Sequence, residues 1–595
     1  MNDKSPIQTD AIALPSHYPR HIAELVNWEQ KIDVAPLYDV LLQSAEKYPH
    51  NICLDFKGRK YTYAQIAHQA KCFANGLQKI AGFQKIAELE KDGLNHGAHV
   101  GLFMPNCPQF VIAYFGILLA GGVVVNYNPL YSTNELKHQI NDSDTEIMVT
   151  LNIKRLYDKV APLIGETTLK HVIIASLADA LPQAKGLLYN MLKRKELSHI
   201  AKHKYSPIYK YSPTCKYNQT YNKNNHNHHH FKSLLKHGEI TEIADICPNL
   251  TIAVLQYTGG TTGVPKGVML THANLYANVV MCKRWFFDAK EGQEIIMGVL
   301  PFFHVFAMTT VMNYGVASGA NIILHPRFEI KAVLKDITNK CPTIMAGVPT
   351  MFAAMVNYPK LSDYNLSSLK ACISGGAGLP LEVKKNFEAK TGCVLVEGYG
   401  LSESSPVVAC NPFVGANKAG SIGLPFPQTI FAIMDKDDGV TGLEHGQIGE
   451  ICVQGEQIMH GYYGHPLETE KTLQNGWLHT GDLGYIDDEN YIFVVDRKKE
   501  MIISGGYNIY PRQIEEAIYT HEKVLECAVI GITHEVKGEV PKAFIVLRAS
   551  EQLTEIELRL YLKQRISAYC VPNDYVFVEF LPKSIIGKIL KKDLR

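Results

Sequence analysis

Hydrophobic residues along this chain form two patterns that alternate: short continuous apolar runs, and longer segments with apolar residues at helical spacing. Short apolar runs such as 100–104 and 123–126 stand next to segments such as 107–120, where the apolar residues recur at helical spacing. The same alternation predicts further strands at 52–56, 60–63, 146–150, 251–256, 295–300, 320–324, 343–347 and 369–374. Strands that alternate with helices are typical of βαβ units, so we predict an α/β fold of stacked mixed and parallel sheets.

The pattern changes twice in the second half of the chain. Between 421 and 495 the predicted strands are short and the turns are dense, which indicates a β-rich subdomain. After residue 496 the pattern starts again with two helices and two strands, at 513–519, 524–530, 543–547 and 553–566. We therefore expect an N-terminal extension over 1–36, a large region over 37–496 and a small, mobile α+β domain over 497–595.

Residues 177–231 interrupt the alternation. They repeat Lys-Tyr-Ser-Pro at 204–207 and 210–213 and then become rich in asparagine and histidine. A polar, low-complexity segment buries little surface, so we expect a surface insertion. Its histidines suit either a metal site or a solvated polar tract. The second is favoured because a further ligand group at metal spacing is missing; the histidines are His226, His228, His229 and His230.

One part of this insertion, 184–195, places apolar residues at helical spacing beside Lys185, Lys193, Arg194 and Lys195. A basic amphipathic helix of this kind can lie on a lipid surface. A plain surface helix suits the pattern equally well. Peripheral contact with the inner face of the cytoplasmic membrane is therefore left open, and so is a homodimer.

Composition narrows the class of protein. The chain has 595 residues, of which 46% are hydrophobic and 20% charged, as in a soluble globular protein with a sizeable core. Its net charge of +1 provides no global field that favours nucleic acid or a membrane surface. The 13 cysteines form no C-x-x-C pair, the polar segment 1–20 lacks a signal-peptide core, and the apolar run 110–125 is too short to cross a bilayer. We expect a cytoplasmic protein.

A loop rich in glycine and threonine follows the strand predicted at 251–256. Glycines allow successive N–H groups to point into one concavity, and hydroxyls and a lysine add donors, which suits a polyphosphate. The loop is not a Walker A motif, because Pro265 precedes its lysine and Gly267 follows it. Its candidate phosphate-binding residues are Thr258, Gly259, Gly260, Thr261, Thr262, Gly263 and Lys266.

Seven further segments have residue types that suit the same chemistry, at 300–304, 374–380, 397–403, 476–482, 495–499, 503–511 and 581–588. Their order and spacing resemble those of the adenylate-forming superfamily, and in particular of bacterial long-chain fatty-acid–CoA ligases. The resemblance covers about 37–595 apart from 177–231. It implies a ligase that forms a carbon–sulfur bond from a fatty acid, ATP and coenzyme A, through an acyl-adenylate and with Mg²⁺.

The resemblance also implies roles for residues of the ATP site. Glu403 would hold Mg²⁺ together with Thr258. Asp482 would bind the ribose diol, and Arg497 would reach ribose or phosphate. Tyr399 would stack on adenine, although core packing is an alternative for this ring. The remaining residues of the implied nucleotide site are Gly375, Gly376, Ala377, Gly398, Gly400 and Ser402.

Four further assignments concern the reacting groups and the domain movement. Lys588 would stabilise charge on the carboxylate and α-phosphate, and a bland basic tail is the alternative. His304 would line the acyl carboxylate site, and a buried core histidine is the alternative. Lys499 would be the hinge, and coenzyme A would pass beside Ser504, Gly505 and Gly506.

Two alternative functions remain open at this stage. The first is an aryl or medium-chain acyl-CoA ligase, or an acyl-AMP ligase that acts on a carrier protein. The second, of another class, is a non-catalytic nucleotide-binding scaffold. The scaffold is disfavoured because Lys266, Glu403, Asp482, Arg497 and Lys588 are all present.

Overall fold

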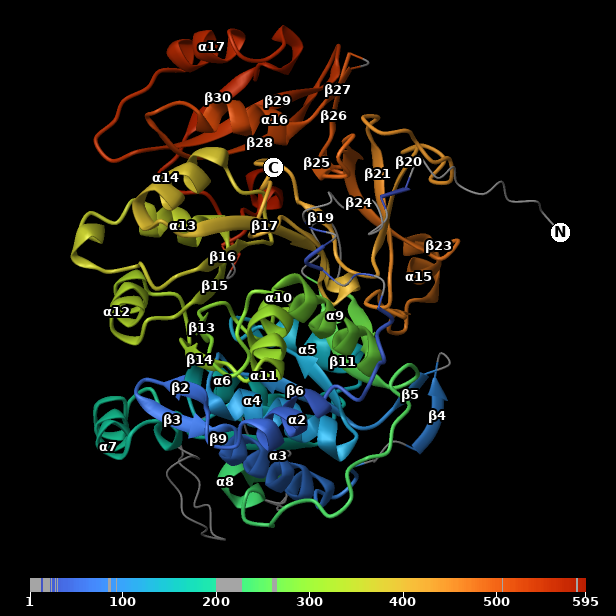
Figure 1. The fold of residues 1–595 in the computed structure, drawn as a ribbon, viewed down its shortest axis with the longest axis vertical. Helices are drawn as coiled ribbons and strands as arrows, with labels where there is room; N and C mark the ends of the chain where they lie inside the picture. The colour runs from blue at the N-terminus through green and yellow to red at the C-terminus, as the bar shows by residue number, and fades with distance from the viewer. Residues whose placement is uncertain are drawn as a thin grey trace, which may run out of the picture.

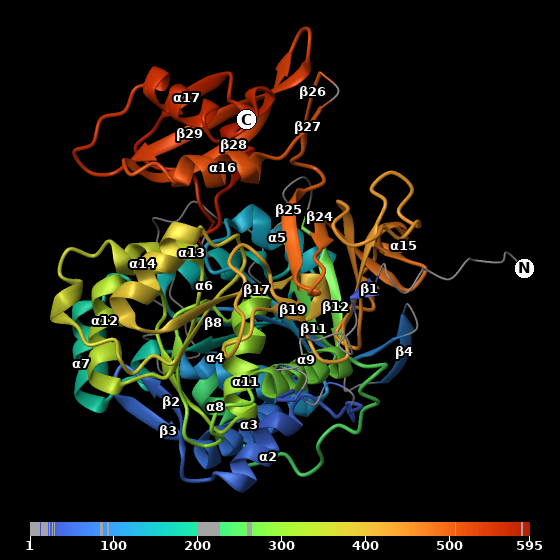
Figure 2. The ribbon, with the colours of Figure 1, turned by 45° about the horizontal axis from the view of Figure 1, so that its top comes forward.

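The structure is a computed structural model that describes residues 12–13, 22, 24–26, 28, 30–83, 87–91, 94–198, 227–258, 265–505, 507–584 and 587–595. Two large sheets and their helices form the N-terminal region, a third sheet lies beside them, and a C-terminal α/β unit covers one end of the whole (Figures 1 and 2). The α/β class predicted from the sequence is confirmed.

The first large sheet has eight strands in the order β10-β9-β8-β6-β7-β11-β12-β22. Strands β10 to β11 are parallel, and β12 and β22 are antiparallel additions at one edge. Apolar residues fill its central strands, which are buried on both faces. The strands are β6 (His99–Phe103), β7 (Val123–Asn126), β8 (Ile147–Leu151), β9 (His171–Ala175), β10 (His228–His230), β11 (Ile252–Tyr257), β12 (Gly267–Thr271) and β22 (Gly461–Tyr462).

The second large sheet has nine strands in the order β19-β18-β17-β16-β15-β13-β14-β2-β3. It is parallel from β17 to β2, and β3, β18 and β19 add antiparallel edges. The strands are β2 (Ile52–Phe56), β3 (Arg59–Thr62), β13 (Ile295–Gly298), β14 (Asn321–Leu324), β15 (Ile344–Gly347), β16 (Ala371–Ser374), β17 (Val394–Gly400), β18 (Val407–Cys410) and β19 (Leu424–Pro425). A separate hairpin pairs β4 (Ala87–Lys91) with β5 (Leu94–His96).

The helices begin where local sequence signals place them. Thr62, Ser132 and Thr271 each cap a helix through a reciprocal capping box. The helix α4 is buried along its entire length, which explains its unbroken apolar sequence. The helices of this region are α2 (Asp39–Lys47), α3 (Tyr63–Gln78), α4 (Pro108–Ala120), α5 (Thr133–Asp142), α6 (Lys154–Val160), α7 (Gln183–Leu192), α8 (Phe231–Leu234), α9 (His272–Trp285), α10 (Val305–Ala307), α11 (Tyr314–Ala317), α12 (Ile330–Lys340), α13 (Pro349–Val356) and α14 (Leu381–Thr391).

Shorter helical turns connect these elements. Most of those in the described part of the chain are 3-10 turns, whereas η7 is a π-helical stretch that separates α10 from α11. The turns are η3 (Ala161–Leu163), η4 (Leu177–Ala180), η7 (Met308–Asn313), η8 (Leu361–Asp363), η9 (Ser402–Ser404) and, near the C-terminus, η10 (Ala568–Cys570).

A third sheet corresponds to the β-rich segment of the sequence. Its strands follow the order β1-β20-β21-β24-β23, and β25 pairs with β24. These strands are β1 (Ile12–Ala13), β20 (Ile430–Met434), β21 (Gly449–Gln454), β23 (Leu473–Gln474), β24 (Trp477–Ile486) and β25 (Ile492–Arg497), with α15 (Pro466–Thr472) beside them. Strand β25 ends at Arg497, so the chain leaves this sheet at the start of the predicted C-terminal domain.

The C-terminal unit has a hydrophobic core of its own, in which residues of α16, α17, β28 and β29 pack together. Its sheet follows the order β27-β26-β29-β28, with β30 beside β29. The elements are β26 (Ile502–Ser504), β27 (Tyr507–Ile509), α16 (Pro511–Tyr519), β28 (Val524–His534), β29 (Gly538–Leu547), α17 (Glu555–Lys563), β30 (Asp574–Phe577) and η11 (Lys591–Leu594).

The insertion expected over 177–231 contains the helix that the pattern at 184–195 indicated, but its last part is not a solvated polar tract. Its first part forms η4 and α7, and its last part forms β10, which extends the eight-stranded sheet beside β9, and the start of α8. The side chains of His228, His229 and His230 are half-buried rather than solvated. Backbone pairing with β9 does not require apolar side chains, so the hydrophobic pattern did not reveal this strand. Residues 199–226, which include His226, lie outside the described part of the chain.

Glu450 of β21 joins the third sheet to the junction with the C-terminal unit. Its carboxylate accepts hydrogen bonds from Lys498 Nζ at 3.0 Å and from Gly481 N at 3.1 Å, and His479 Nδ1 lies 3.7 Å away. Burial alone would raise the pKa of Glu450, but the hydrogen bonds and charges of His479 and Lys498 outweigh it and lower the pKa to about 2.

Replacing Glu450 with glutamine should lower the free energy of unfolding at pH 7 by about 1–3 kcal/mol, because charged partners remain around a neutral group. The folded-state pKa lies below the ordinary value, so the carboxylate stabilises the fold above about pH 4.5 and loses this effect as the pH falls towards about 2. Urea unfolding at pH 7 and pH 3.5 should therefore show a smaller difference at the lower pH. The exposed Glu470→Gln is the control, and an equal loss at both pH values would contradict the ionic role.

Candidate active site

The predicted phosphate loop connects two neighbouring strands of the eight-stranded sheet. Strand β11 leads into it, β12 leads out, and the two strands pair antiparallel. At the base of the loop Thr258 N donates to the Lys266 carbonyl oxygen at 3.1 Å. The loop itself lies outside the described residues, so the roles assigned to five of its members stay predictions: Gly259, Gly260, Thr261, Thr262 and Gly263.

Lys266 and Glu403 lie on the two sides of one tyrosine. The Lys266 ammonium is 2.6 Å from Glu468 Oε2 and 5.0 Å from the centroid of the Tyr462 ring. The Tyr462 hydroxyl donates to Glu403 Oε1 at 2.8 Å. Tyr462 belongs to β22, which pairs with β12 directly after the loop. The sheet therefore brings the predicted phosphate-binding lysine and the predicted metal ligand to one wall of the site.

Glu403 is the candidate magnesium ligand, together with Thr258 at the base of the loop. Mg²⁺ is held by one or two carboxylates and by substrate phosphates rather than by a cage made only of protein groups. A half-buried carboxylate near a phosphate loop fits this chemistry. Among the described residues no cluster of three or more metal-ligating side chains occurs. The available donor set thus suits a metal that arrives with a nucleotide.

The candidate ribose-binding residue Asp482 is a buried carboxylate with two partners. Tyr399 on β17 donates its hydroxyl to Asp482 Oδ2 at 2.5 Å, and Arg497 Nε lies 3.0 Å from Asp482 Oδ1. Asp482 and Arg497 face each other across the β24–β25 pair. The Asp482 charge raises the pKa of Arg497, and burial with the same charge raises the pKa of Tyr399 well above its ordinary value.

The candidate adenine segment follows β16, at the carboxyl end of the parallel strands. A Cβ on Gly375 would lie 3.0 Å from the Phe306 ring and 3.3 Å from the Gly398 carbonyl oxygen, so only glycine fits there without a shift. Gly376 and Ala377 are exposed beyond it. On the neighbouring strand β17, Gly398 and Gly400 flank Tyr399, and Ser402 opens η9 before Glu403; these are the other predicted nucleotide contacts.

His304 lines a narrow apolar pocket beside this segment, with Leu300, Phe306, Val348 and Gly376. Its Nδ1 accepts a hydrogen bond from Phe306 N at 3.3 Å, which leaves the proton of a neutral ring on Nε2. Burial, with a smaller contribution from the Lys588 charge, lowers the pKa of His304 to about 4. The ring is therefore neutral near pH 7.

Lys588 stands on a turn of the C-terminal unit that rests against α13 and beside the pocket residue Val348. Ser584 N donates to the Lys588 carbonyl at 2.8 Å, and Lys588 N donates to Ser584 Oγ at 3.1 Å. A Cβ on Gly587 would lie 2.4 Å from Thr350 Oγ1 and 3.2 Å from Val348 Cγ2. Burial, followed by the charge of Arg497, lowers the pKa of Lys588 to about 8. The structure thus brings Lys588 near Arg497, Asp482 and His304.

The other predicted C-terminal residues belong to the turn and the hairpin that follow β25. Lys499 is exposed in the turn after β25. Ser504 pairs with Gly538, and Gly505 N donates to the Lys537 carbonyl at 2.8 Å, so both contact their own unit. Gly506 lies outside the described residues. Lys588 therefore lies near the candidate ribose-binding pair of Asp482 and Arg497, and the predicted coenzyme A segment lies on the β26–β27 hairpin.

An ion-paired anchor also joins the C-terminal unit to β17. Arg512 at the start of α16 lies 3.8 Å from the buried Glu397 carboxylate and packs over Gly378. Burial raises the pKa of Glu397 to about 7, although the Arg512 charge opposes the rise. Lys591 bridges Glu500 and Glu515 at 3.2 and 2.9 Å in the same junction.

Sequence reasoning missed Tyr462 and Glu468. They belong to the wall of the site that also carries Lys266 and Glu403, which we call the phosphate wall. Neither stands in a segment with an evident chemical signature, and their partners lie far away along the chain. An aromatic residue two positions before a glycine-containing turn was the only local signal.

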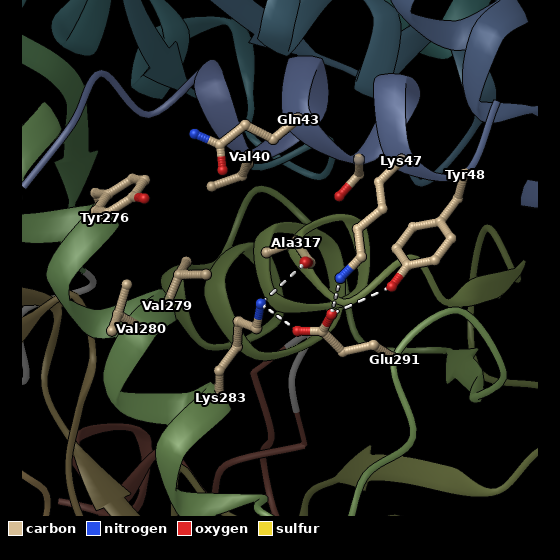
Figure 3. A pocket seen from close by; sticks show the side chains of 11 residues that line it. Val40, Gln43, Lys47, Tyr48, Tyr276, Val279, Val280, Lys283, Glu291 and Ala317 are labelled. Atoms are coloured by element: carbon tan, nitrogen blue, oxygen red, sulfur yellow. Dashed lines mark hydrogen bonds and ion pairs between the residues drawn. The ribbon is translucent and has the colours of Figure 1, made fainter. Parts of the chain in front are cut away.

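A second pocket, of about 170 Å³, lies between α2 and α9 and contains none of the predicted site residues. Figure 3 shows Glu291 at its edge between Lys47 and Lys283, each 2.6 Å from a carboxylate oxygen. Lys47 and Lys283 are therefore both paired with Glu291, and we assign this pocket no part in the candidate active site.

Residues 41–463 match the family described as AMP-binding enzyme, and residues 513–588 match the AMP-binding enzyme C-terminal domain. This chain belongs to the AMP-binding enzyme family. It is 42% identical to the long-chain-fatty-acid–CoA ligase of Bacillus subtilis, over 94% of each chain. It is 34% identical to the corresponding ligase of Escherichia coli O157:H7, over 98% of this chain and 97% of the relative.

Solved structures of the family have the same fold. The ATP-bound structure of MatB from Rhodopseudomonas palustris aligns with a TM-score of 0.78 and 25% identity, over 94% of this chain and 98% of that one. The anthranilate CoA ligase AuaEII with anthranoyl-AMP aligns with the same TM-score at 22% identity, over 96% and 98% of the two chains, which supports the fold alone.

Replacing Gly587 with alanine should lower the rate of adenylate formation at least tenfold, because the new methyl group would displace the Lys588 turn from Thr350. Pyrophosphate exchange into ATP measures this half-reaction. Gly446→Ala is the matched control, since Gly446 has a similar positive φ of 81° against 78° but has open space around it. An equal loss in both variants would show that backbone strain, and not the contact with Thr350, is responsible.

Proposed function

We propose that this chain is an ATP-dependent long-chain-fatty-acid–CoA ligase. The observation that carries the proposal is the convergence of Lys588, the Asp482–Arg497 pair and the His304 pocket, contributed by both parts of the chain. A cationic group beside an apolar pocket suits a fatty carboxylate that must meet an anionic phosphate. Long-chain substrates are favoured because the relatives with 42% and 34% identity are named for them.

In the first half-reaction, a carboxylate oxygen attacks the α-phosphorus of ATP and the bond to the β-phosphate breaks. Both reactants are anionic, so the site must offset their repulsion. Lys588 holds positive charge beside the reacting oxygens, and Lys266 does so at the departing diphosphate. One preorganised donor of this type is typically worth about 2.7–4 kcal/mol in the transition state. Asp482 and Arg497 hold the ribose, and the neutral His304 closes the acyl side.

Mg²⁺ held by Glu403, with Thr258, would neutralise phosphate charge when bound. The Tyr462 hydroxyl donates a hydrogen bond to Glu403 Oε1 and so fixes the orientation of the carboxylate. The Lys266–Glu468 ion pair must open before the lysine reaches a phosphate, so Glu468 holds the lysine in place in the unliganded protein.

In the second half-reaction, the thiol sulfur of coenzyme A attacks the acyl carbon, AMP leaves and the thiol proton is released. Ser504, Gly505 and Gly506 are assigned to the thiol path, where small residues leave room for the pantetheine arm. Lys499, exposed between β25 and β26, is assigned to the hinge. An exposed residue between two strands can absorb the backbone change that domain rotation needs.

The cellular setting is part of the same proposal. The cysteines in the described part of the chain are free thiols, which supports a cytoplasmic, reducing setting. Within that part, no helix has the length and hydrophobicity that crossing a bilayer requires. The homodimer that the sequence analysis left open stays untested.

A second candidate is an aryl-CoA ligase, because 4-coumarate–CoA ligase 1 of Arabidopsis thaliana is 31% identical over 94% of this chain. A scan of carboxylic acids with ATP, Mg²⁺ and coenzyme A separates the two. We expect AMP and acyl-CoA from palmitate, with kcat/KM at least tenfold above octanoate, benzoate and 4-coumarate. A preference for the aromatic acids would overturn the long-chain assignment. Pyrophosphate exchange without thioester would indicate an acyl-AMP ligase, and neither activity would indicate a scaffold.

Replacing Lys588 with alanine should lower pyrophosphate exchange by about 10²–10³-fold. It should leave thioester formation from preformed palmitoyl-AMP largely intact. Equal losses in both half-reactions would contradict the assigned role.

The pH dependence provides a second test of Lys588. The charged form is lost as the pH rises through about 8, so kcat/KM for adenylation should fall above that pH. Lys588→Arg keeps its charge at all these pH values. This variant should be slower at pH 7 but should lack the alkaline fall, and an unchanged profile would assign the fall to another group.

A further inference from the structure

The helix α7 exposes apolar side chains to solvent. Leu187, Leu188, Met191 and Leu192 are 69%, 52%, 75% and 73% exposed. They follow the spacing i, i+1, i+4 and i+5, so they form one stripe along the helix. Single exposed apolar residues are common on protein surfaces, but a contiguous patch marks a binding surface.

The orientation of α7 is set by its opposite face. Gly186 is buried there, and a Cβ on it would lie 2.6 Å from the Ala178 carbonyl oxygen. At 100° per residue the centre of the exposed stripe lies about 170–190° from Gly186, on the far side of the helix. Close packing of the glycine face therefore points the apolar stripe outward, and rotation of the helix cannot bury it.

Basic side chains surround the stripe. Lys185 Nζ donates to the Lys57 carbonyl at 2.9 Å, and Arg59 Nη1 donates to the Asp179 carbonyl at 2.6 Å. These contacts fasten the β2–β3 turn against η4 and α7. The exposed basic residues of the turn and helix are Lys57, Arg59, Lys60, Lys185, Lys193, Arg194 and Lys195.

Few acidic groups offset this charge. Asp179 pairs with Lys232 at 3.0 Å, and Glu196 pairs with Lys193 at 2.6 Å. Asp55 lies under the turn, where it is buried and paired with Lys340. The surface made by α7 and the β2–β3 turn, which we call the α7 face, is therefore apolar at its centre and cationic at its rim.

Both ribbon views place α7 at the edge of the N-terminal region, beside β2 and β3 and away from the C-terminal unit (Figures 1 and 2). Strand β3 is the edge strand of the nine-stranded sheet. A flat surface can therefore approach the α7 face without meeting the C-terminal unit.

We infer that the α7 face docks the protein on an anionic lipid bilayer. A helix with an apolar stripe and flanking lysines lies in the interface with its apolar side chains among the acyl chains, while the cations meet anionic headgroups. A second copy of this chain is a poorer occupant, because a two-fold contact would place two cationic rims against each other. Docking rests on the α7 face alone; its benefit, access to membrane-dissolved fatty acid, rests on the proposed function.

Co-sedimentation of the full chain with vesicles tests the inference. With 30% phosphatidylglycerol in phosphatidylcholine, we expect binding that weakens at least fivefold between 50 and 300 mM NaCl, and little binding to phosphatidylcholine alone. The triple variant Leu187→Gln, Met191→Gln, Leu192→Gln should bind at least tenfold more weakly. Each of these side chains is exposed, so the fold should persist.

Ile556→Gln, Leu560→Gln is the matched control, since these residues of α17 are 72% and 57% exposed on the C-terminal unit. This control should bind like the wild type. Lack of wild-type binding, equal binding to both vesicle types, or equal loss in the control would overturn the inference. So would a wild-type dimer that the triple variant converts to monomer, which would make the α7 face a self-interface. Palmitate turnover without vesicles should be unchanged in the triple variant, which separates this test from that of the proposed function.

Discussion

The contacts of one buried carboxylate, that of Asp482, join two sheets of this molecule at the candidate active site. Asp482 is almost fully buried, and a buried charge is stable only when it is paired and hydrogen-bonded. Its partners are Tyr399 from the nine-stranded sheet and Arg497 at the end of the third sheet. The same contacts therefore join two sheets and fix the carboxylate that we propose as the acceptor for a ribose diol. Arg497 is also the last strand residue before the junction, so the start of the C-terminal unit depends on this pairing.

Elements with strong local periodicity could be predicted from the sequence. Helix α4 and strands β7 and β11 begin and end within a residue or two of their expected positions, because apolar runs and the glycines beside them are local signals. Tyr399, Asp482, Arg497 and Lys588 lie near one another in the structure, and the roles that the motif resemblance implies for them stay predictions. Periodicity alone could not have brought them together, because Lys588 approaches Arg497 only through the fold of another unit.

Features that depend on backbone pairing or on distant partners could not be predicted. Strand β10 is made of histidines and pairs through its main chain, so it has no apolar signature. Tyr462 joins the phosphate wall because β22 pairs with β12, a contact between residues nearly 200 positions apart. The sequence predicted an amphipathic helix at α7. The packing of Gly186 on Ala178 in the structure shows that the apolar side of this helix faces outward.

The seat of the Gly587 turn on Thr350 has a consequence for the direction of the reaction. A group that stabilises a transition state accelerates the forward and the reverse step alike. In the proposed mechanism Lys588, which stands on this turn, stabilises adenylate formation. Lifting the turn from Thr350 would then also remove the group that diphosphate needs in order to remake ATP from the adenylate. Such a movement would make adenylate formation effectively irreversible. Once the turn had moved away from Thr350, the acyl-adenylate would react back to ATP only slowly and would proceed to the thioester.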